Sequence, residues 1–328
     1  MADLFGRKYS LVIGNPKKVT QPQEITRAGE TFKIDQVFPG TIPPEIQEQE
    51  FIEITDLQIR ASLPQTKTAS TKARDKAYIE IYNLSNETLE FIQRSKLILL
   101  KGGYKQDKEL SYLFTGEILS VSSERNGQDI VTTLLCGQRV RVGKDVRVQK
   151  TYSAGVAYKD IIQDLLNIAK DNFLPVGNVQ LPSGTGEFYP DSNKEISFTN
   201  RGLPIEGYLL DELDRVCAQI GYRAYMVLGK IMVEPLEAPR TREEYQVFPE
   251  NLQAEPKVAL KAQYDSASDD VQQEITLKMY LDGDITTDKR IRLREGRHKG
   301  LYTITNVEHV LDFEGKEWTT EVTAKIVS

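Results

Sequence analysis

The stretch from Lys76 to Val142 constrains the fold most, because it contains several strand patterns joined by short turns. Apolar and polar residues alternate between positions 76 and 82, as they do in a strand with one buried face. Asn126-Gly127 is a strong hairpin signal. It separates the last two of three further expected strands, at 97–100, 110–122 and 129–136. These strands, with a short helix after the first, predict a small closed or nearly closed β-barrel.

The short helix is expected directly after the first of these strands. Ser85 can cap its N-terminus, and Glu87 places a negative charge in its first turn, where the helix dipole favours one. Leu89 and Ile92 would then be buried. After the helix, Gly102-Gly103 predicts the end of the next strand.

The region before this stretch contains shorter patterns. Strands are expected at 9–13 and 31–37, and the prolines and glycine of residues 38–44 indicate a loop. A longer strand is expected from 51 to 63. Its apolar positions change phase at Thr55-Asp56, which indicates a β-bulge.

In the middle of the chain the apolar period becomes that of amphipathic helices. The stripe of a first helix consists of Tyr158, Ile161, Ile162, Leu165, Leu166 and Ala169. A second helix is expected to start after Pro204 and to end at Gly221. The other segments here are a Gly/Pro/Ser-rich loop at 181–193 and a hairpin formed by 222–227 and 231–235.

From about Pro256 strand patterns return, and they echo the first barrel. Gly116–Gln128 and Gly300–Lys316 each contain a strand after a glycine, followed by a turn that a second glycine closes. A strand with a threonine pair follows each of them, Thr132-Thr133 or Thr319-Thr320. The similarity is weak, and it makes an internal duplication a hypothesis for the fold.

The composition is that of a soluble globular protein, since 39% of the 328 residues are hydrophobic and 27% are charged. A net charge of −6 argues against a protein that coats nucleic acid. No apolar run is long enough to cross a membrane, and the run at 11–13 is too short for a signal peptide. We therefore expect a chain that stays in the cytoplasm until it assembles. Cys136 and Cys217 are expected to be buried free thiols.

Sequence signatures of hydrolases are absent: the chain has neither a G-x-S-x-G nor an H-E-x-x-H motif. A Ser-His-Asp triad would have to use His298, in a charged turn, or His309, in a strand. We predict that neither is catalytic. No catalytic, cofactor-binding or metal-binding residue is predicted, and the chain is not expected to be an enzyme.

Two loops are similar to ligand-binding motifs but depart from them. Gly137–Lys144 has one residue too many between its glycines for a phosphate-binding loop, and Asp145 stands where Ser or Thr should follow. Asp282–Asp288 is similar to a calcium loop, but Leu293 occupies the position of the glutamate that closes such sites. We expect an ordinary acidic turn there.

The polar segment from Pro64 to Asp75 carries Lys67, Lys72 and Arg74. Two interpretations stay open: a loop that docks on an acidic partner or on passing DNA, and a solvated hairpin tip.

An ordered set of short motifs carries a family resemblance. It consists of I-E-I-Y-N-L-S (79–85), L-L-K-G-G-Y (99–104), F-T-G (114–116) and G-x-D…T-x-L-x-C (127–136). This set resembles the late-control-protein-D-like family of phage tail baseplate hub proteins, found in contractile tails. The set Gly300, Tyr302, Ile304, Val307 and His309, followed by Trp318, is similar to the family's C-terminal strands.

The resemblance implies an α+β, β-rich fold with two similar tube-type β-barrel domains and a small α+β insert. The expected parts are N-terminal strands and a loop packed on the first barrel (1–50), the first barrel (51–145), the insert (146–236) and the second barrel (237–328). It further implies a homotrimer, in which six barrels form a ring around a channel that stacks on the six-fold tail tube.

The function implied is that of a structural hub in the virion, assembled in the host cytoplasm. Implied partners are the tail tube or a tube-initiator protein, the central spike, the tape measure protein and baseplate wedge proteins, with phage DNA only in transit. Two alternatives stay open: a β-rich module that binds a receptor or glycan, and a peptidoglycan hydrolase. The residues that line the channel or join the subunits are not named by the sequence.

Overall fold

Most strands of the molecule join one thirteen-stranded sheet. The computed structural model describes residues 6–16, 24–27, 30–33, 49–66, 76–137, 146–172, 174, 176–181, 199, 201–227, 230–235, 244–262 and 271–326. Within these residues the fold is β-rich. Neighbouring strands of the large sheet run antiparallel within these residues, apart from the parallel pair β15 (Glu244–Val247) and β18 (Arg290–Leu293).

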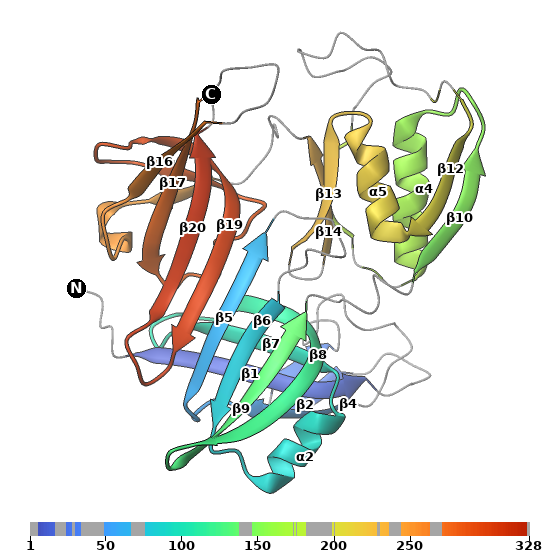
Figure 1. Cartoon of the computed structure of the whole chain (residues 1–328). Coiled ribbons are helices and arrows are strands. Elements are labelled where there is room, and N and C mark those ends of the chain that lie inside the picture. The colour runs from blue at the N-terminus through green and yellow to red at the C-terminus, as the bar shows by residue number, and fades with distance from the viewer. Residues whose placement is uncertain are drawn as a thin grey trace.

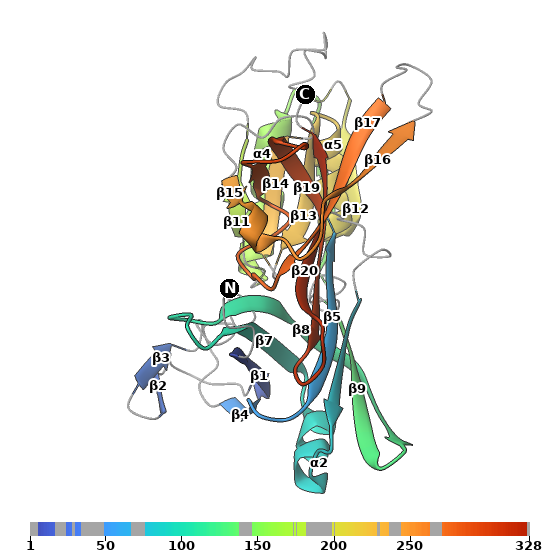
Figure 2. The same cartoon turned by 90° about the vertical axis from the view of Figure 1, so that its left-hand side faces the viewer.

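One half of the sheet comes from the N-terminal part of the chain (Figure 1). Its strands, in spatial order, are β5 (Ile59–Thr66), β6 (Lys76–Tyr82), β9 (Asp129–Gly137), β8 (Ser111–Asn126), β7 (Leu97–Tyr104), β1 (Arg7–Pro16) and β4 (Gln49–Ile54). Figure 2 shows that β7, β1 and β4 form a second layer beside β5, β9 and β8. The core lies between these layers and includes Leu11, Ile79 and Leu100.

The C-terminal half repeats this order. Its strands are β16 (Lys257–Ala262), β17 (Val271–Tyr280), β20 (Trp318–Ile326), β19 (Gly300–Asp312), then β18 and β15. They correspond in turn to β5, β6, β9, β8, β7 and β1, although β15 runs parallel to its neighbour. A separate core that includes Leu277, Ile304 and Val322 supports this half. The weak sequence repeat therefore reflects two halves with one strand order.

The two halves meet where β19 pairs with β5, from Asn306 opposite Thr66 to Asp312 opposite Arg60. The strands of the two predicted barrels thus form one continuous sheet. Among the described strands its path runs from β16 to β4 without returning to its start. The large sheet is thus not closed into a barrel, and the two predicted tube-type barrel domains, of which the first was expected to be closed or nearly closed, are not confirmed. In the first half, the edge of β5 that faces away from β6 is paired with β19 of the other half.

The middle of the chain places two helices between two small sheets (Figure 1). Helix α4 (Tyr158–Asp171) buries all six residues of the predicted stripe, and α5 (Leu209–Ala218) packs beside it. One sheet pairs β10 (Arg147–Tyr152) with β12 (Leu203–Tyr208). The other has β14 (Lys230–Pro235) between β11 (Val176–Val179) and β13 (Tyr222–Val227). No helix in the described ranges is long and apolar enough to span a membrane.

Several local predictions are confirmed. Helix α2 (Asn86–Arg94) starts at Ser85, whose side chain accepts a hydrogen bond from the backbone N–H of Thr88 at 3.1 Å. Ile92 is buried, and Leu89 is half-buried. The hairpin of β13 and β14 has the predicted position, with residues 228–229 outside the described ranges. The β8–β9 hairpin also forms, but its two-residue loop is Gly127-Gln128, since Asn126 already pairs with Asp129. Gly127 has φ +64°, as the first loop position of a type II′ turn requires.

The expected strand 51–63 is two strands. β4 ends at Ile54 and β5 begins at Ile59, and they pair with different neighbours, β1 and β6. The phase change at Thr55-Asp56 therefore marks a turn between layers instead of a bulge. A phase change in one sequence does not distinguish the two, because both interrupt the alternation.

Gly102-Gly103 does not end β7, which continues to Tyr104. A Cβ atom on Gly102 would lie 2.6 Å from a side-chain carbon of Leu113, and Gly103 accepts a hydrogen bond from the indole of Trp318 at 3.3 Å. The glycines therefore allow close packing inside a strand, which is the second common role of glycine in sheets.

Pro204 does not begin the second helix, because it lies in β12 and the helix starts at Leu209. β12 pairs only with β10 among the described strands, so a residue without an N–H costs no hydrogen bond on its open side. The helix ends at Ala218, and Gly221, with φ +70°, follows it as predicted.

The N-terminal predictions are described in part. β1 includes the predicted strand at 9–13, and β3 (Glu30–Lys33) pairs with β2 (Glu24–Arg27) as a separate hairpin. Residues 34–37 of the predicted strand, the loop at 38–44 and residues 182–193 of the loop at 181–193 lie outside the described residues. A short 3-10 helix (Pro249–Asn251) precedes β16.

The turn of the β19–β20 hairpin is held by the first half of the sheet. Trp318, 1% exposed, and Leu311 belong to the core of that half. Arg7 of β1 donates to the backbone carbonyls of Asp312 and Gly315, each at 2.7 Å, and its guanidinium lies 5.5 Å from the Trp318 ring centre. The ring of Phe313 meets that of Tyr9 edge-on at 4.9 Å. These contacts fix the position of one half on the other.

His309 lies next to this junction and is completely buried. Its Nδ1 is 3.0 Å from the Thr320 hydroxyl, whereas its Nε2 has no hydrogen-bond partner in the described part of the molecule. Burial lowers the pKa of His309 to about 4, because the imidazolium would lose its hydration there. The side chain is therefore neutral at pH 7.

We predict that His309 makes the fold acid-sensitive. An unfolded histidine, with its ordinary pKa of 6.5, binds a proton in the window between that value and about 4, where the folded one does not. Stability is therefore lost as pH falls through this window, by roughly 3 kcal/mol in total. The check is urea unfolding at pH 7, 6 and 5. His309→Gln should flatten the dependence, and His298→Gln, the matched control, should not. Equal slopes for wild type and His309→Gln would contradict the prediction.

Candidate interaction face

Between β17 and β8 the continuous sheet has one face that turns away from its two main cores, whereas at β7 and β1 the same face carries a small buried cluster that includes Val12 and Leu99. In β5 the residues Ile59, Ala61, Leu63 and Gln65 are buried, whereas Arg60, Ser62, Pro64 and Thr66 are exposed or half-buried. The same alternation occurs in β6, β17 and β19. Because directly paired residues share a face, the pairings carry this surface from strand to strand across the junction. We call it the polar face.

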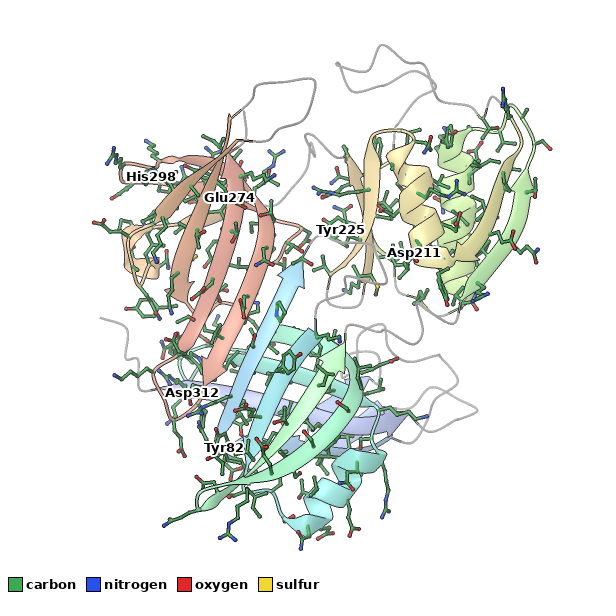
Figure 3. All side chains as sticks on the ribbon, in the orientation of Figure 1. Tyr82, Asp211, Tyr225, Glu274, His298 and Asp312 are labelled. Carbon is green, nitrogen blue, oxygen red and sulfur yellow. The ribbon has the colours of Figure 1, made fainter. Side chains whose placement is uncertain are left out.

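One row of paired residues shows how far the polar face extends. From β17 to β8 the row consists of Tyr280, Thr319, Val310, Ser62, Tyr78, Leu135 and Ser120, of which all but the buried Thr319 are exposed or half-buried. In Figure 3 Glu274 marks one end of the face, and Asp312 and Tyr82 mark the other. The surface therefore spans both halves of the chain without a break at β19 and β5.

Charges of both signs occur on the polar face, and its described side chains include more acidic than basic ones. The acidic side chains are Glu80, Glu117, Glu124, Asp129, Glu274, Glu308, Asp312 and Glu321, and the basic ones are Arg60, Lys76, Lys257, Lys278 and Lys325. The face therefore shares the acidic excess of the whole chain, whose net charge is −6. A surface of this kind stays hydrated without presenting a cationic patch to phosphates.

Polar contacts on this face connect the two halves. The Arg60 guanidinium is 3.2 Å from the Asp312 carboxylate and 5.4 Å from the Tyr82 ring centre. The Ser62 hydroxyl donates to Glu308 at 2.7 Å. From the turn before β5, the Gln58 amide donates to Asp312 at 2.6 Å. These contacts hold the register in which β19 meets β5.

Lys278 takes part in two ion pairs in the second half. Its ammonium is 2.9 Å from Glu317 and 3.2 Å from Glu321, and the hydrogen bond to Glu317 raises the pKa of Lys278. All three side chains are exposed to solvent by a third or more, so the pairs contribute little to stability. Their effect is to keep both charge signs interspersed over β17 and β20.

The two histidines lie at opposite ends of β19 and not on the polar face. His298 is half-buried in the turn before the strand, where its backbone carbonyl accepts a hydrogen bond from the Tyr302 hydroxyl at 2.9 Å. His309 is in the core, with Thr320 as its neighbour. The structure does not bring the two histidines together.

The acidic turn at 282–288 uses its carboxylates within the protein. Asp282 accepts hydrogen bonds from the Tyr245 hydroxyl and from the backbone of Asp284, and Asp288 accepts one from Thr286. Burial and the Asp282 carboxylate raise the pKa of Tyr245. Leu293 is buried. Within the described residues, no three His, Cys, Asp or Glu side chains gather closely enough to hold a metal ion.

The remaining predicted features are placed only in part. Cys136 and Cys217 are buried free thiols, as predicted, and burial raises the pKa of Cys136 to about 12. The phosphate-loop-like segment lies outside the described residues after Gly137. Lys67, Lys72 and Arg74 of the polar segment lie outside them too, whereas residues 64–66 belong to β5.

At the level of sequence, no protein-family model and no curated protein matches the chain. Solved structures do share its fold. The tail protein from Neisseria meningitidis MC58 has a TM-score of 0.53 and 10% identity, and the match covers 98% of this chain and 97% of that protein. The 43 kDa tail protein of prophage MuSo2 from Shewanella oneidensis has a TM-score of 0.54 and 7% identity, covering 97% and 98%. The chain therefore has the fold of phage tail proteins, as the resemblance in its sequence predicted.

Proposed function

We propose that the chain is the structural hub of a phage tail baseplate. The observation that carries this proposal is the continuous sheet, in which two halves of one strand order present a single polar face. The whole-chain similarity in fold to two tail proteins supports a role in the tail. Because fold alone does not fix function, the proposal rests on this sheet and on the motifs of the sequence.

In this proposal three copies close a ring around a central channel. Each copy contributes two equivalent halves, so the ring presents six units to the tail tube and keeps three-fold symmetry for the spike. Each half then acts as one tube-type barrel of the assembled hub. In a closed ring of identical copies the contacts are head-to-tail, so one edge of each copy meets a different edge of the next copy.

The polar face forms the channel wall in this arrangement. Its excess of acidic over basic side chains suits a conduit through which tape measure and DNA pass, since a cationic wall would retain phosphates. The opposite face is occupied by the cores and is not available for this purpose.

The partners we propose are the tail tube or a tube-initiator protein, the spike, the tape measure protein and baseplate wedge proteins of a contractile tail. The division at 1–50, 51–145, 146–236 and 237–328 is proposed to separate a supporting segment, two ring-forming units and a peripheral insert. The protein would assemble in the host cytoplasm and reside in the virion.

The mass of the purified chain in solution tests the ring. Light scattering should give about three times 37.2 kDa, either for the chain alone or after the spike protein is added. A strict monomer that ignores spike and tube proteins but binds a glycan would favour the receptor-binding alternative instead.

Charge reversal on the polar face tests the channel. Phage that carry Glu80→Lys together with Glu321→Lys should release their genome several-fold more slowly, because the wall would then attract phosphates. Glu295→Lys, in the turn before β19, is the control and should leave release unchanged. Release at the wild-type rate from particles with the double change would exclude a channel at this face.

We also propose that the chain has no catalytic activity. In a zymogram against peptidoglycan, the full chain should leave the substrate intact at concentrations where a lysozyme control clears it. If the chain produced a clear zone, the same assay on His298→Gln and His309→Gln would show whether a histidine is responsible, and the purely structural role would be wrong.

A further inference from the structure

We infer that β8 of one copy pairs with β16 of the next, in a register that repeats the pairing of β19 with β5 inside the chain. This inference rests on the proposed ring and names the strands and residues that would join its subunits. It follows from comparing the two halves position by position.

A shared irregularity aligns the two hairpins. The β8–β9 ladder shifts register between Ile118 and Ser120, and the β19–β20 ladder shifts between Ile304 and Asn306. Each shift follows the segment in which the first strand pairs with its other neighbour, β7 or β18. Bulges fix the local twist and register of a strand, so we take Ile118 and Ile304 as equivalent.

A cross-strand polar pair agrees with this alignment. Five residues after the aligned isoleucines come Ser123 and His309. The Ser123 hydroxyl is 2.9 Å from the Thr132 hydroxyl, and His309 Nδ1 is 3.0 Å from the Thr320 hydroxyl. Thr132 and Thr320 are both completely buried. The two hairpins therefore match in pairing, in bulge and in one side-chain contact.

The halves differ in what borders each hairpin. After its bulge, β19 has β5 on its second edge, from Asn306 to Asp312. The equivalent part of β8, from Ser120 to Asn126, has no second neighbour among the described strands, and neither does β16, the equivalent of β5. One chain thus has two open strand edges, on β8 and on β16, that are equivalent to the two edges paired at the β19–β5 junction.

The exposure of side chains follows the same difference. Residues 122–130 are all exposed, although they form a regular hairpin. Ile130 is 48% exposed, whereas Trp318, at the equivalent position of β20, is 1% exposed in the other half's core. An exposed hairpin with a large apolar residue is a surface that association would cover.

The register follows from the strands between the edges. Ser62 pairs with Tyr78, and Lys257 pairs with Thr276 at the equivalent position of β17, so Lys257 corresponds to Ser62. Within the chain Ser62 faces Val310, whose equivalent in β8 is Glu124. The proposed pairing therefore places Glu124 of one copy opposite Lys257 of the next. Both side chains are exposed, and a directly opposed pair of opposite charge stabilises a sheet.

A disulfide between the predicted partners tests the register. Two residues along, Ser122 should face Ala259 of the next copy, and both are exposed. In the full chain, with spike protein added if the chain alone is monomeric, Ser122→Cys with Ala259→Cys should oxidise to dimers and trimers on a non-reducing gel. The native cysteines are buried and do not compete.

Three controls accompany this variant. Each variant with a single added cysteine should give no cross-linked species larger than a dimer. Asn126→Cys with Ala259→Cys, shifted by four residues or about 13 Å, should not form the trimer band, because a disulfide needs Cα atoms within about 7 Å. Equal cross-linking of the shifted and in-register variants would overturn the proposed register.

Light scattering on the same samples separates the two proposals. A trimer without in-register cross-links would overturn the β8–β16 pairing and leave the ring intact. A chain that stays monomeric with every tail partner would overturn the ring and the pairing with it. Cross-linked trimers support both.

Charge exchange gives a second, independent test. Glu124→Lys and Lys257→Glu should each raise the protein concentration needed for half-assembly by about twofold to fivefold per interface, and the double variant should restore it. Glu295→Lys serves as a control for net charge. A double variant as defective as the sum of the two single ones would show that these residues do not meet.

Discussion

The pairing of β19 with β5 is the constraint on which the rest of the molecule depends. It joins two halves of the sheet that have separate cores, and it carries the polar face across both halves. A slip by one residue would turn Leu311 and His309 toward solvent and Glu308 toward the core. Arg7 and Trp318 prevent such a slip, because they fix the hairpin turn to β1 and to the backbone of Gly103.

Local patterns in the sequence were sufficient for the elements that local physics determines. The stripe of α4 and the Ser85 cap depend on residues within one or two helical turns. Failures occurred where one signal has two structural causes. A phase change is equally compatible with a bulge and with a turn, as at Thr55. A pair of glycines is equally compatible with the end of a strand and with close packing inside one, as at Gly102.

The polar face could be predicted only in part. The alternation within each strand can be read from neighbouring residues, but the order in which distant strands pair cannot. Each strand shows which of its residues avoid the core, yet the strands that meet at the junction are far apart in sequence. Ser62 and Glu308, which form a hydrogen bond there, are 246 residues apart. Arg7 illustrates the same limit: an arginine in a short strand near the N-terminus carries no signal that it will hold a turn near the C-terminus.

The two halves differ in the strand edge that each leaves beside its hairpin: the edge of β19 is paired within the chain, whereas that of β8 is open among the described strands. The edge of β19 is covered as the chain folds, so it can carry a buried histidine and lead to a buried tryptophan. The equivalent edge of β8 must remain soluble in a free chain, and there Ser122, Ser123 and Glu124 occupy the positions of Glu308, His309 and Val310. Polar and charged residues are the usual protection of an open strand edge against indiscriminate pairing. In the proposed pairing Glu124 also meets Lys257 of the next copy, so the charge that protects the open edge would at the same time favour the correct partner strand.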